Sequence, residues 1–163
     1  MAAAAKTNAV RLLDRTGVVY KLLPYDLADT AFSAEAVADS LGLPTGGVFK
    51  TLAARSAGAS CLAVVPGDSE LDLKALARAV GERRMEMVPV ADLLALTGYR
   101  RGSVTALGTK RPMAVYLDES ALEHDAIAVS AGTEGLQVLL APGDYMEVTG
   151  ARLVSIARHS GGQ

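Results

Sequence analysis

The side chain with the most unusual surroundings in this sequence is that of Lys50. It stands within residues 48–54, an otherwise apolar or small stretch that directly follows a pair of glycines. If this stretch is a strand, Lys50 shares one face with Val48 and Leu52, because side chains alternate along a strand. The lysine then lies either at an exposed sheet edge or in the wall of a pocket. Burying an ammonium group is costly unless it meets an anion or acceptors, so a pocket lysine predicts a substrate that supplies them.

Two other segments could approach a ligand closely. Residues 97–108 contain glycines and several small hydroxyl side chains, and a glycine backbone lets a ligand come near because it has no Cβ atom. Residues 129–132 read Val-Ser-Ala-Gly, so a strand that ends there can present Ser130 and backbone amides to a cleft. Each segment can also be a plain connection or turn.

The standard catalytic signatures are missing. The chain has neither a P-loop nor a GxGxxG motif, and its two histidines, His124 and His159, have no metal-like partners nearby in the sequence. A structural zinc site takes four ligands of the Cys or His type, and with Cys61 this chain has three such residues, although carboxylate sites stay open. We expect Cys61 to be structural, because a reactive thiol needs exposure and positive neighbours. The expectation is therefore no metal and no cofactor.

Composition limits the partners and the compartment. The 163 residues carry a formal net charge of −2, so any contact with RNA has to come from local basic patches rather than from the whole chain. The basic pairs at residues 83–84, 100–101 and 110–111 are candidates, although a pair of this kind is more typical of a solvated surface. A lone cysteine cannot form a disulfide within the chain, which fits a reducing compartment. Without a signal peptide or a membrane-length apolar run, we expect a cytoplasmic protein with no membrane partner.

The elements that must position these residues alternate irregularly. Asp72 and Ser33 are typical helix N-caps, and glycines end several of the periodic segments. We predict helices over residues 8–15, 33–41, 73–80, 90–96 and 142–148, and strands over residues 18–24, 48–54, 61–66, 113–117, 126–130, 136–140 and 152–156. Because helices and strands mix without a strict βαβ order, the fold class is predicted to be α+β with a mixed sheet. No repeat or linker divides the chain, so one domain is expected.

Taken in order, several segments resemble the YbaK/EbsC and prolyl-tRNA-synthetase-associated editing family. They are Leu41-Gly42-Leu43 with residues 48–52, residues 71–74, residues 97–99 with 102–108, and residues 129–132 with 135–136. The likeness runs from about residue 18 to residue 158, nearly the whole chain. No one segment is decisive, but their order and spacing together are specific.

The resemblance implies a fold and an activity. The fold is a single domain whose twisted mixed sheet forms a partial barrel flanked by short helices, with a core over about residues 18–158 and flexible ends at 1–5 and 159–163. The activity is hydrolysis of mischarged tRNA in the cytoplasm, most typically Cys-tRNA(Pro), with prolyl-tRNA synthetase as an optional partner. Two alternatives remain: a deacylase for another small residue such as Ala or Ser, or a module that binds tRNA ends or small ligands without turnover.

The resemblance also assigns roles to residues. It makes Lys50 the essential lysine, and it implies substrate contacts at Tyr25, Phe32, Thr51, Gly102, Ser103, Ser130, Gly132 and Gln137. Two positions depart from the family pattern, since Ala106 stands where proline is usual and Gln137 where aspartate is frequent. Both departures put the exact substrate in doubt more than the reaction type.

For a cysteinyl ester, the resemblance suggests that the thiol of the substrate attacks its own carbonyl. An aligned intramolecular nucleophile can reach an effective molarity of about 10⁵ M or more, which would explain the lack of a Ser-His or Cys-His pair. Lys50 would then hold the phosphate, sugar or carbonyl oxygens as an ammonium. It could act as a base instead if burial lowers its pKa.

Overall fold

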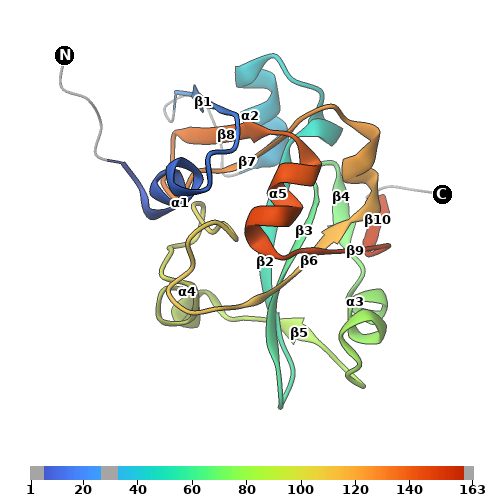
Figure 1. Cartoon of the computed structure of the whole chain (residues 1–163). Coiled ribbons are helices and arrows are strands. Elements are labelled where there is room, and N and C mark those ends of the chain that lie inside the picture. Colours follow the sequence, from blue (N-terminus) through green and yellow to red (C-terminus); the bar gives the residue numbers. More distant parts are fainter. Residues whose placement is uncertain (1–5, 27–32, 160–163) are drawn as a thin grey trace.

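The computed structural model describes residues 6–26 and 33–159, whose helices and strands are arranged as in Figure 1. The α-helices are α1 (Asn8–Thr16), α2 (Ala34–Leu41), α3 (Leu73–Val80), α4 (Val90–Thr97) and α5 (Pro142–Thr149). The strands are β1 (Tyr20–Pro24), β2 (Phe49–Arg55), β3 (Ser60–Pro66), β4 (Ser69–Leu71), β5 (Glu86–Met87), β6 (Ala114–Asp118), β7 (Ile127–Ser130), β8 (Leu136–Leu140), β9 (Arg152–Val154) and β10 (Ala157–His159). Short 3₁₀ helices, η2 (Thr45–Gly47) and η3 (Glu119–Glu123), precede β2 and follow β6.

Local signals start three of the helices. The side chains of Thr7, Ser33 and Asp72 accept hydrogen bonds from the first-turn amides of α1, α2 and α3, which satisfies donors that have no partner inside the helix. Gly42 ends α2 with a φ of +69°, a left-handed conformation in which a Cβ atom is unfavourable. The predicted helix at 33–41, with its cap and its end, is confirmed.

The described strands form three sheets, and none of these sheets closes on itself. The largest has the order β5-β2-β3-β6-β9. Its β5-β2-β3 part is antiparallel and its β3-β6-β9 part is parallel, so the prediction of an α+β fold with a mixed sheet is confirmed. A second, antiparallel sheet has the order β1-β8-β7, and β4 pairs with β10 in the third. An isolated parallel bridge between Val48 and Ala128 joins the start of β2 to β7.

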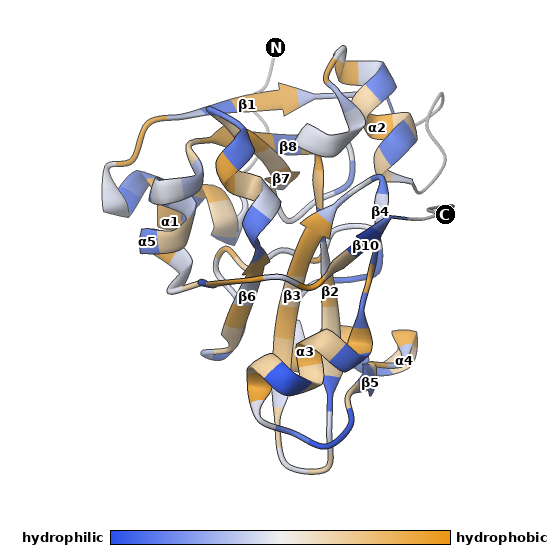
Figure 2. Cartoon of the chain, turned by 90° about the vertical axis from the view of Figure 1, so that its right-hand side faces the viewer, coloured by the Kyte–Doolittle hydropathy of each residue, from blue (hydrophilic) through white to orange (hydrophobic). Residues whose placement is uncertain are grey.

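Two cores use the opposite faces of β2 and β3. Phe49 and Ala53 pack into the larger cluster, which also takes Tyr145 of α5 and side chains of α1. Ala54 and Leu76 belong to the second cluster, which α3 covers. Figure 2 shows β3 as an almost continuous apolar strand at the centre of the molecule, as expected for a strand that is buried on both faces.

Several features lay outside the sequence predictions. Strands β4, β5 and β10 span two or three residues each, which is too few for an alternating pattern of apolar and polar residues. They form only because a partner strand lies beside them. Ala9 and Leu13 of α1 are fully buried in the larger core, so the packed part of the chain includes this helix. No described helix is long and apolar enough to cross a membrane. Cys61 is buried, and burial raises the pKa of its thiol to about 11, which agrees with a structural cysteine.

Candidate active site

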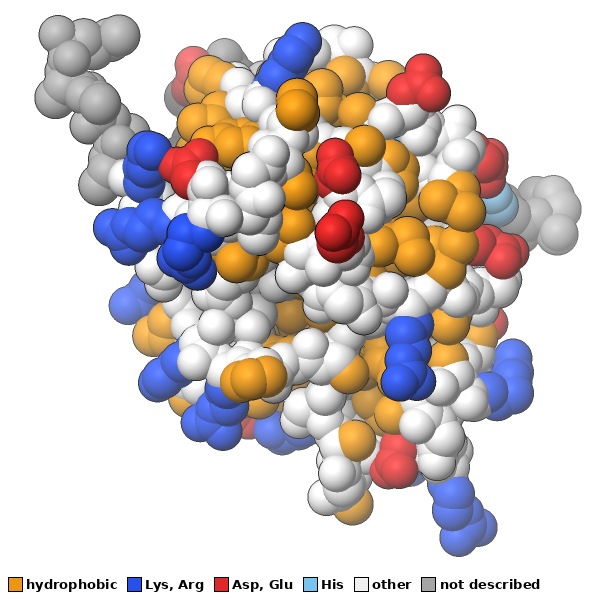
Figure 3. All heavy atoms as spheres, viewed as in Figure 1, with side chains coloured by type: hydrophobic (Ala, Val, Ile, Leu, Met, Phe, Trp, Pro, Cys, Tyr) orange, Lys and Arg blue, Asp and Glu red, His pale blue; other side chains and the backbone are white. Residues whose placement is uncertain are grey.

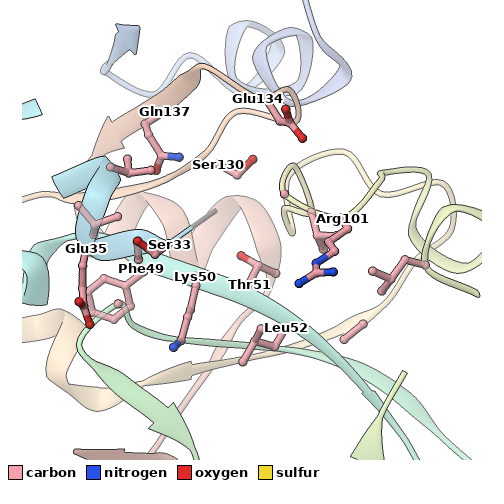
Figure 4. Close-up of a pocket in the computed structure, with 18 of the residues that line it drawn as sticks. Ser33, Glu35, Phe49, Lys50, Thr51, Leu52, Arg101, Ser130, Glu134 and Gln137 are labelled. Carbon is pink, nitrogen blue, oxygen red and sulfur yellow. The ribbon is translucent and has the colours of Figure 1, made fainter. Parts of the chain in front are cut away.

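A cavity of about 730 Å³ lies beside β2. Strand β2 forms one wall, and the others come from α2, from the segment that surrounds α4, and from the β7–β8 hairpin (Figure 4). The predicted site residues that line it are Tyr25, Lys50, Thr51, Gly102, Ser130 and Gln137. Tertiary structure therefore brings together residues that lie more than a hundred positions apart in the sequence.

Lys50 lines this cavity and is half-buried. Its strand pairs with β3 along the whole length of β2, whereas β5 pairs on the other side only with Ala54 and Arg55. Among the described residues, no strand ladder therefore covers the edge of β2 beside Lys50, where the cavity lies. The two alternatives left by the sequence, a sheet edge and a pocket wall, both describe this lysine.

The cavity wall carries charges of both signs. Lys50 and Arg101 are its cations, and Glu35 and Glu134 are its carboxylates. Within the part of the chain that the structure describes, no hydrogen bond or ion pair occupies any of these four side chains. In Figure 4 the Arg101 guanidinium points from the loop after α4 toward β2. The cations can hold phosphate or carbonyl oxygens, and the carboxylates can accept hydrogen bonds from an ammonium group.

Two polar side chains of the wall are buried without a hydrogen-bond partner. They are Thr51, through its Oγ1 atom, and Gln137, through its Oε1 atom, and the hydroxyl of Tyr145 has no partner either among the described residues. Burial raises the pKa of Tyr145 far above its ordinary value, and an interaction with Thr51 offsets a small part of this rise. The two hydroxyls thus lie near each other. Such unpaired groups are rare in folded proteins, and they are more expected in a functional site than in a plain core.

Ser130 fastens the glycine-rich loop to the β7–β8 hairpin. Its hydroxyl donates to the Ser103 carbonyl at 3.0 Å and accepts the Gly132 amide at 3.1 Å. The loop is held a second time by Tyr99, whose hydroxyl donates to the Leu107 carbonyl at 2.6 Å. The one proton of the Ser130 hydroxyl is therefore already used within the protein, and its position fixes the loop that carries Gly102.

Two predicted contact residues lie outside the cavity wall. Ser103 is 8% exposed and lies outside the cavity wall, where its hydroxyl donates to the Arg100 carbonyl at 3.0 Å. Gly132 also lies outside the wall, with a φ of +91°, and a Cβ atom there would come within 2.7 Å of the Tyr99 ring. For these two residues the structure shows a packing role beside the site. Phe32 lies outside the described residues.

The sequence did not point to several residues of the wall. Arg101 was included only as half of a basic pair and as part of the segment 97–108, and neither Glu35 nor Glu134 was singled out. The apolar part of the wall includes Met87 and Val90, whose side chains are 42% and 57% exposed. The only local signal was the glycine-bounded turn around Glu134, because a short hairpin turn often projects its side chains from the end of a sheet.

Imidazole and thiol groups are absent from the described wall. His124 instead packs its ring against the edge of Phe49, with the ring centroids 6.2 Å apart. The described residues contain no group of three or more His, Cys, Asp or Glu side chains that could hold a metal ion. The chemistry that the wall can supply therefore consists of two cations, two carboxylates, hydroxyl and amide groups, and the free edge of β2.

Comparison with known proteins agrees with this arrangement. The family description of the aminoacyl-tRNA editing domain matches residues 28–148. A candidate Cys-tRNA(Pro)/Cys-tRNA(Cys) deacylase of Enterococcus faecalis, EbsC, is 41% identical over 152 residues, which cover 93% of each chain. A multifunctional Ser/Thr-tRNA deacylase of Escherichia coli K12, ProXp-y, is 25% identical over 154 residues, which cover 91% of this chain and 90% of that protein.

Solved structures share the fold. A candidate trans-editing enzyme for prolyl-tRNA synthetase superposes with a TM-score of 0.84 at 24% identity, over 95% of this chain and 99% of the other. The hypothetical protein APE2540 superposes with a TM-score of 0.85 at 20% identity, over 93% of this chain and all of the other. At these identities the likeness establishes the fold.

Proposed function

The chain belongs to the aminoacyl-tRNA editing domain family, and from this premise we propose that it is a trans-acting deacylase that hydrolyses mischarged tRNA, with Cys-tRNA(Pro) as its main substrate. The observation that carries the proposal is Lys50, which is half-buried in the cavity wall and has no hydrogen bond or ion pair among the described residues. The 41% identity to EbsC over nearly the whole chain supports the choice of substrate. Aminoacyl-tRNA is used in the cytoplasm, where we place the protein.

The cavity suits the charged end of a tRNA. Its volume of about 730 Å³ lies within the range of sites that bind small molecules, so it can admit an aminoacyl ester with its ribose. Lys50 and Arg101 would hold the anionic part of this end, and the exposed apolar side chains of Met87 and Val90 offer a face on which the terminal base can pack. Figure 3 shows further basic side chains along the left of its face, over α1 and the segment after α4, where the rest of the acceptor arm can dock.

The nucleophile is proposed to come from the substrate. The cysteinyl sulfur bonds to its own carbonyl carbon, the ester bond to the ribose breaks, and the thiol proton ends on the ribose oxygen. Water then opens the cyclic thioester to give free cysteine. Lys50, as an ammonium, stabilises the charge that develops on the carbonyl oxygen, which is where preorganised donors contribute most to rate.

A second substrate class has its own support. ProXp-y, at 25% identity, acts on seryl- and threonyl-tRNA by its name, and Gln137 gives this cavity a neutral side chain where the family often has aspartate. Ala106, the other departure, is buried in the core and does not line the cavity. Gln137 is therefore the departure that can alter the substrate. A hydroxyl substrate would be cleaved by water or by its own hydroxyl, which is the weaker nucleophile.

The test is a set of tRNA(Pro) molecules charged with Cys, Ser, Thr or Ala, incubated with the protein and followed by the loss of aminoacyl-tRNA. The proposal expects Cys-tRNA(Pro) to be cleared fastest, and S-alkylated Cys-tRNA(Pro) to resist. Equal rates on the Cys and Ala forms would contradict participation of the thiol, but they would still agree with the proposed deacylase function. Clearance of none of the four would refute the proposed function. Adding prolyl-tRNA synthetase to the same assay asks whether that enzyme is a partner, which we expect to show as a lower KM.

A further inference from the structure

One edge of β2 stays without a partner strand where it faces the cavity. On its other edge, β2 pairs with β3 from Phe49↔Pro66 to Arg55↔Ser60. On the cavity side, β5 reaches only Ala54 and Arg55. The bridge between Val48 and Ala128 joins the start of the strand to β7, and no ladder continues from it among the described residues. The assigned pairing of β2 with β7 therefore stops at this bridge, and the cavity lies beside the part of β2 that follows it.

The register shows which backbone groups point toward this cavity. The Gly67 amide donates to the Val48 carbonyl at 2.7 Å, and the Ser56 amide donates to the Ala59 carbonyl at 2.7 Å. Both bonds continue the β2–β3 register and involve even-numbered residues of the first strand. In an antiparallel pair, residues alternate between those that bond to the neighbour and those that point away. The odd-numbered residues of β2 thus direct their amides and carbonyls toward the cavity side.

A further bond confirms the direction. The Val88 amide, from the cavity side, donates to the Ala53 carbonyl at 3.0 Å. The amide and carbonyl of Thr51 point the same way, since this residue lies two positions before Ala53. Among the described residues no strand ladder or bridge pairs with Thr51 from that side, and Thr51 lines the cavity. Backbone amides and carbonyls inside a protein need hydrogen-bond partners, and a ligand in the cavity can supply them for Thr51.

We propose that the aminoacyl group of the substrate pairs with Thr51 as a one-residue β-strand. The ester carbonyl accepts a hydrogen bond from the Thr51 amide, and the α-ammonium group donates one to the Thr51 carbonyl. This is the exchange that two opposite residues make in an antiparallel ladder, and it is how extended peptides add to free sheet edges. The inference rests on the proposed function, and it names the groups that recognise the part common to every aminoacyl ester.

The geometry also suits catalysis. The Thr51 amide is held by the β3 pairing of its neighbours Lys50 and Leu52, so it does not reorganise when charge develops on the ester oxygen. A rigid donor aimed at that oxygen is an oxyanion hole, and the ammonium of Lys50 lies on the adjacent residue. Opposite residues of a ladder share a face, so the substrate side chain lies beside that of Thr51. Residue 51 therefore limits the size of the amino acid.

The experiment replaces one backbone amide by an ester, through an α-hydroxy acid introduced during translation. The α-hydroxy analogue of threonine at position 51 removes the donor and keeps the side chain. The matched control is lactic acid at position 53, two residues further along the same edge. Like the ester at 51, it turns the carbonyl of the preceding even-numbered residue, which faces β3, into a weaker ester acceptor. We expect kcat on Cys-tRNA(Pro) to fall about 10²-fold for the ester at 51, and to change less than threefold for the ester at 53. Equal losses at both positions, or no loss at 51, would overturn the pairing.

A second measurement uses the unmodified protein, so it does not depend on how the ester variants fold. The substrate is tRNA(Pro) charged with 3-mercaptopropionate, which keeps the thiol and lacks the α-ammonium group. We expect its enzymatic rate, divided by its spontaneous hydrolysis rate, to fall at least about tenfold below that of Cys-tRNA(Pro), the size of one charge-assisted hydrogen bond. An equal ratio would refute the bond to the Thr51 carbonyl. If unmodified protein clears no aminoacyl-tRNA, the proposed function itself fails, which is a different result from either of these.

Discussion

Replacing Ser130 by alanine separates a fastening role from direct contact with substrate. The hydroxyl bridges the Ser103 carbonyl and the Gly132 amide at 3.0 and 3.1 Å. Ser103 is 8% exposed, so its carbonyl would lose a partner that water replaces poorly. A buried polar group left unpaired costs about 1–3 kcal/mol. We take about 2 kcal/mol for Ser130→Ala, with the Gly132 amide partly rehydrated.

The expected thermal shift follows from this free energy. In a domain of this size, each 1 kcal/mol lowers Tm by about 2–4 °C, so Ser130→Ala should lower Tm by about 4–8 °C. The loop that carries Arg101 and Gly102 loosens as well, so KM should rise about threefold to tenfold while kcat changes little, in line with a loss of binding alone. Differential scanning calorimetry and the deacylation assay give both values. Ser155→Ala is the control and should change neither, because this serine is exposed and its hydroxyl makes no hydrogen bond to another described residue.

One outcome would refute this reasoning. If Ser130→Ala keeps its Tm within about 1 °C and loses kcat by about 10²-fold, the size expected for a lost transition-state donor, the hydroxyl acts on the substrate and the fastening is unimportant. A fall in Tm together with unchanged kinetics would instead show that the loop keeps its position without this bridge.

Three further predictions follow from the same structure. Lys50→Ala should keep the fold and lower the deacylation rate on the order of 10²-fold. Lys74→Ala, at an exposed lysine of α3, is the control and should keep the deacylation rate. Normal activity of folded Lys50→Ala would remove this residue from the mechanism. Burial raises the pKa of Cys61 from 9.0 to about 11, so the thiol keeps its proton to higher pH in the folded state than in the unfolded state. The free energy of unfolding should therefore fall between about pH 9 and pH 11, by about 2–3 kcal/mol in total. Cys61→Ala should flatten this part of the stability-against-pH profile from urea denaturation, and an unchanged slope would assign the pH dependence to other groups. With a net charge of −2, tRNA binding should be weak with a shallow salt dependence. Alanine at Arg100 and Arg101 should reduce the slope of log Kd against log salt more than alanine at Arg83 and Arg84. A filter-binding series that gives the opposite order would contradict this prediction.

The sequence by itself determined most of the regular elements. Helices α1, α2 and α3 begin at side chains that cap them and end at glycines, and these signals act over a few residues. Strands β2, β3 and β8 are long enough for their apolar pattern to be recognised. The family resemblance then ordered these segments into one fold, which the comparisons confirmed. Helix caps, helix ends and strand patterns can be recognised in a sequence because their physical cause lies within one turn or one strand.

The site depended on contacts that no local pattern records. The sequence singled out Lys50, but whether it lies at an edge or in a pocket depends on β5 ending early and on β7 pairing with β2 at one bridge alone among the described residues. Arg101 and Glu134 join the cavity wall only because the loop after α4 and the β7–β8 hairpin fold over that edge. Ser103 and Gly132, which a motif placed beside the substrate, pack behind the wall. Pairing between distant strands decides which backbone groups stay free, since each amide can be satisfied only by whatever segment the tertiary fold places beside it.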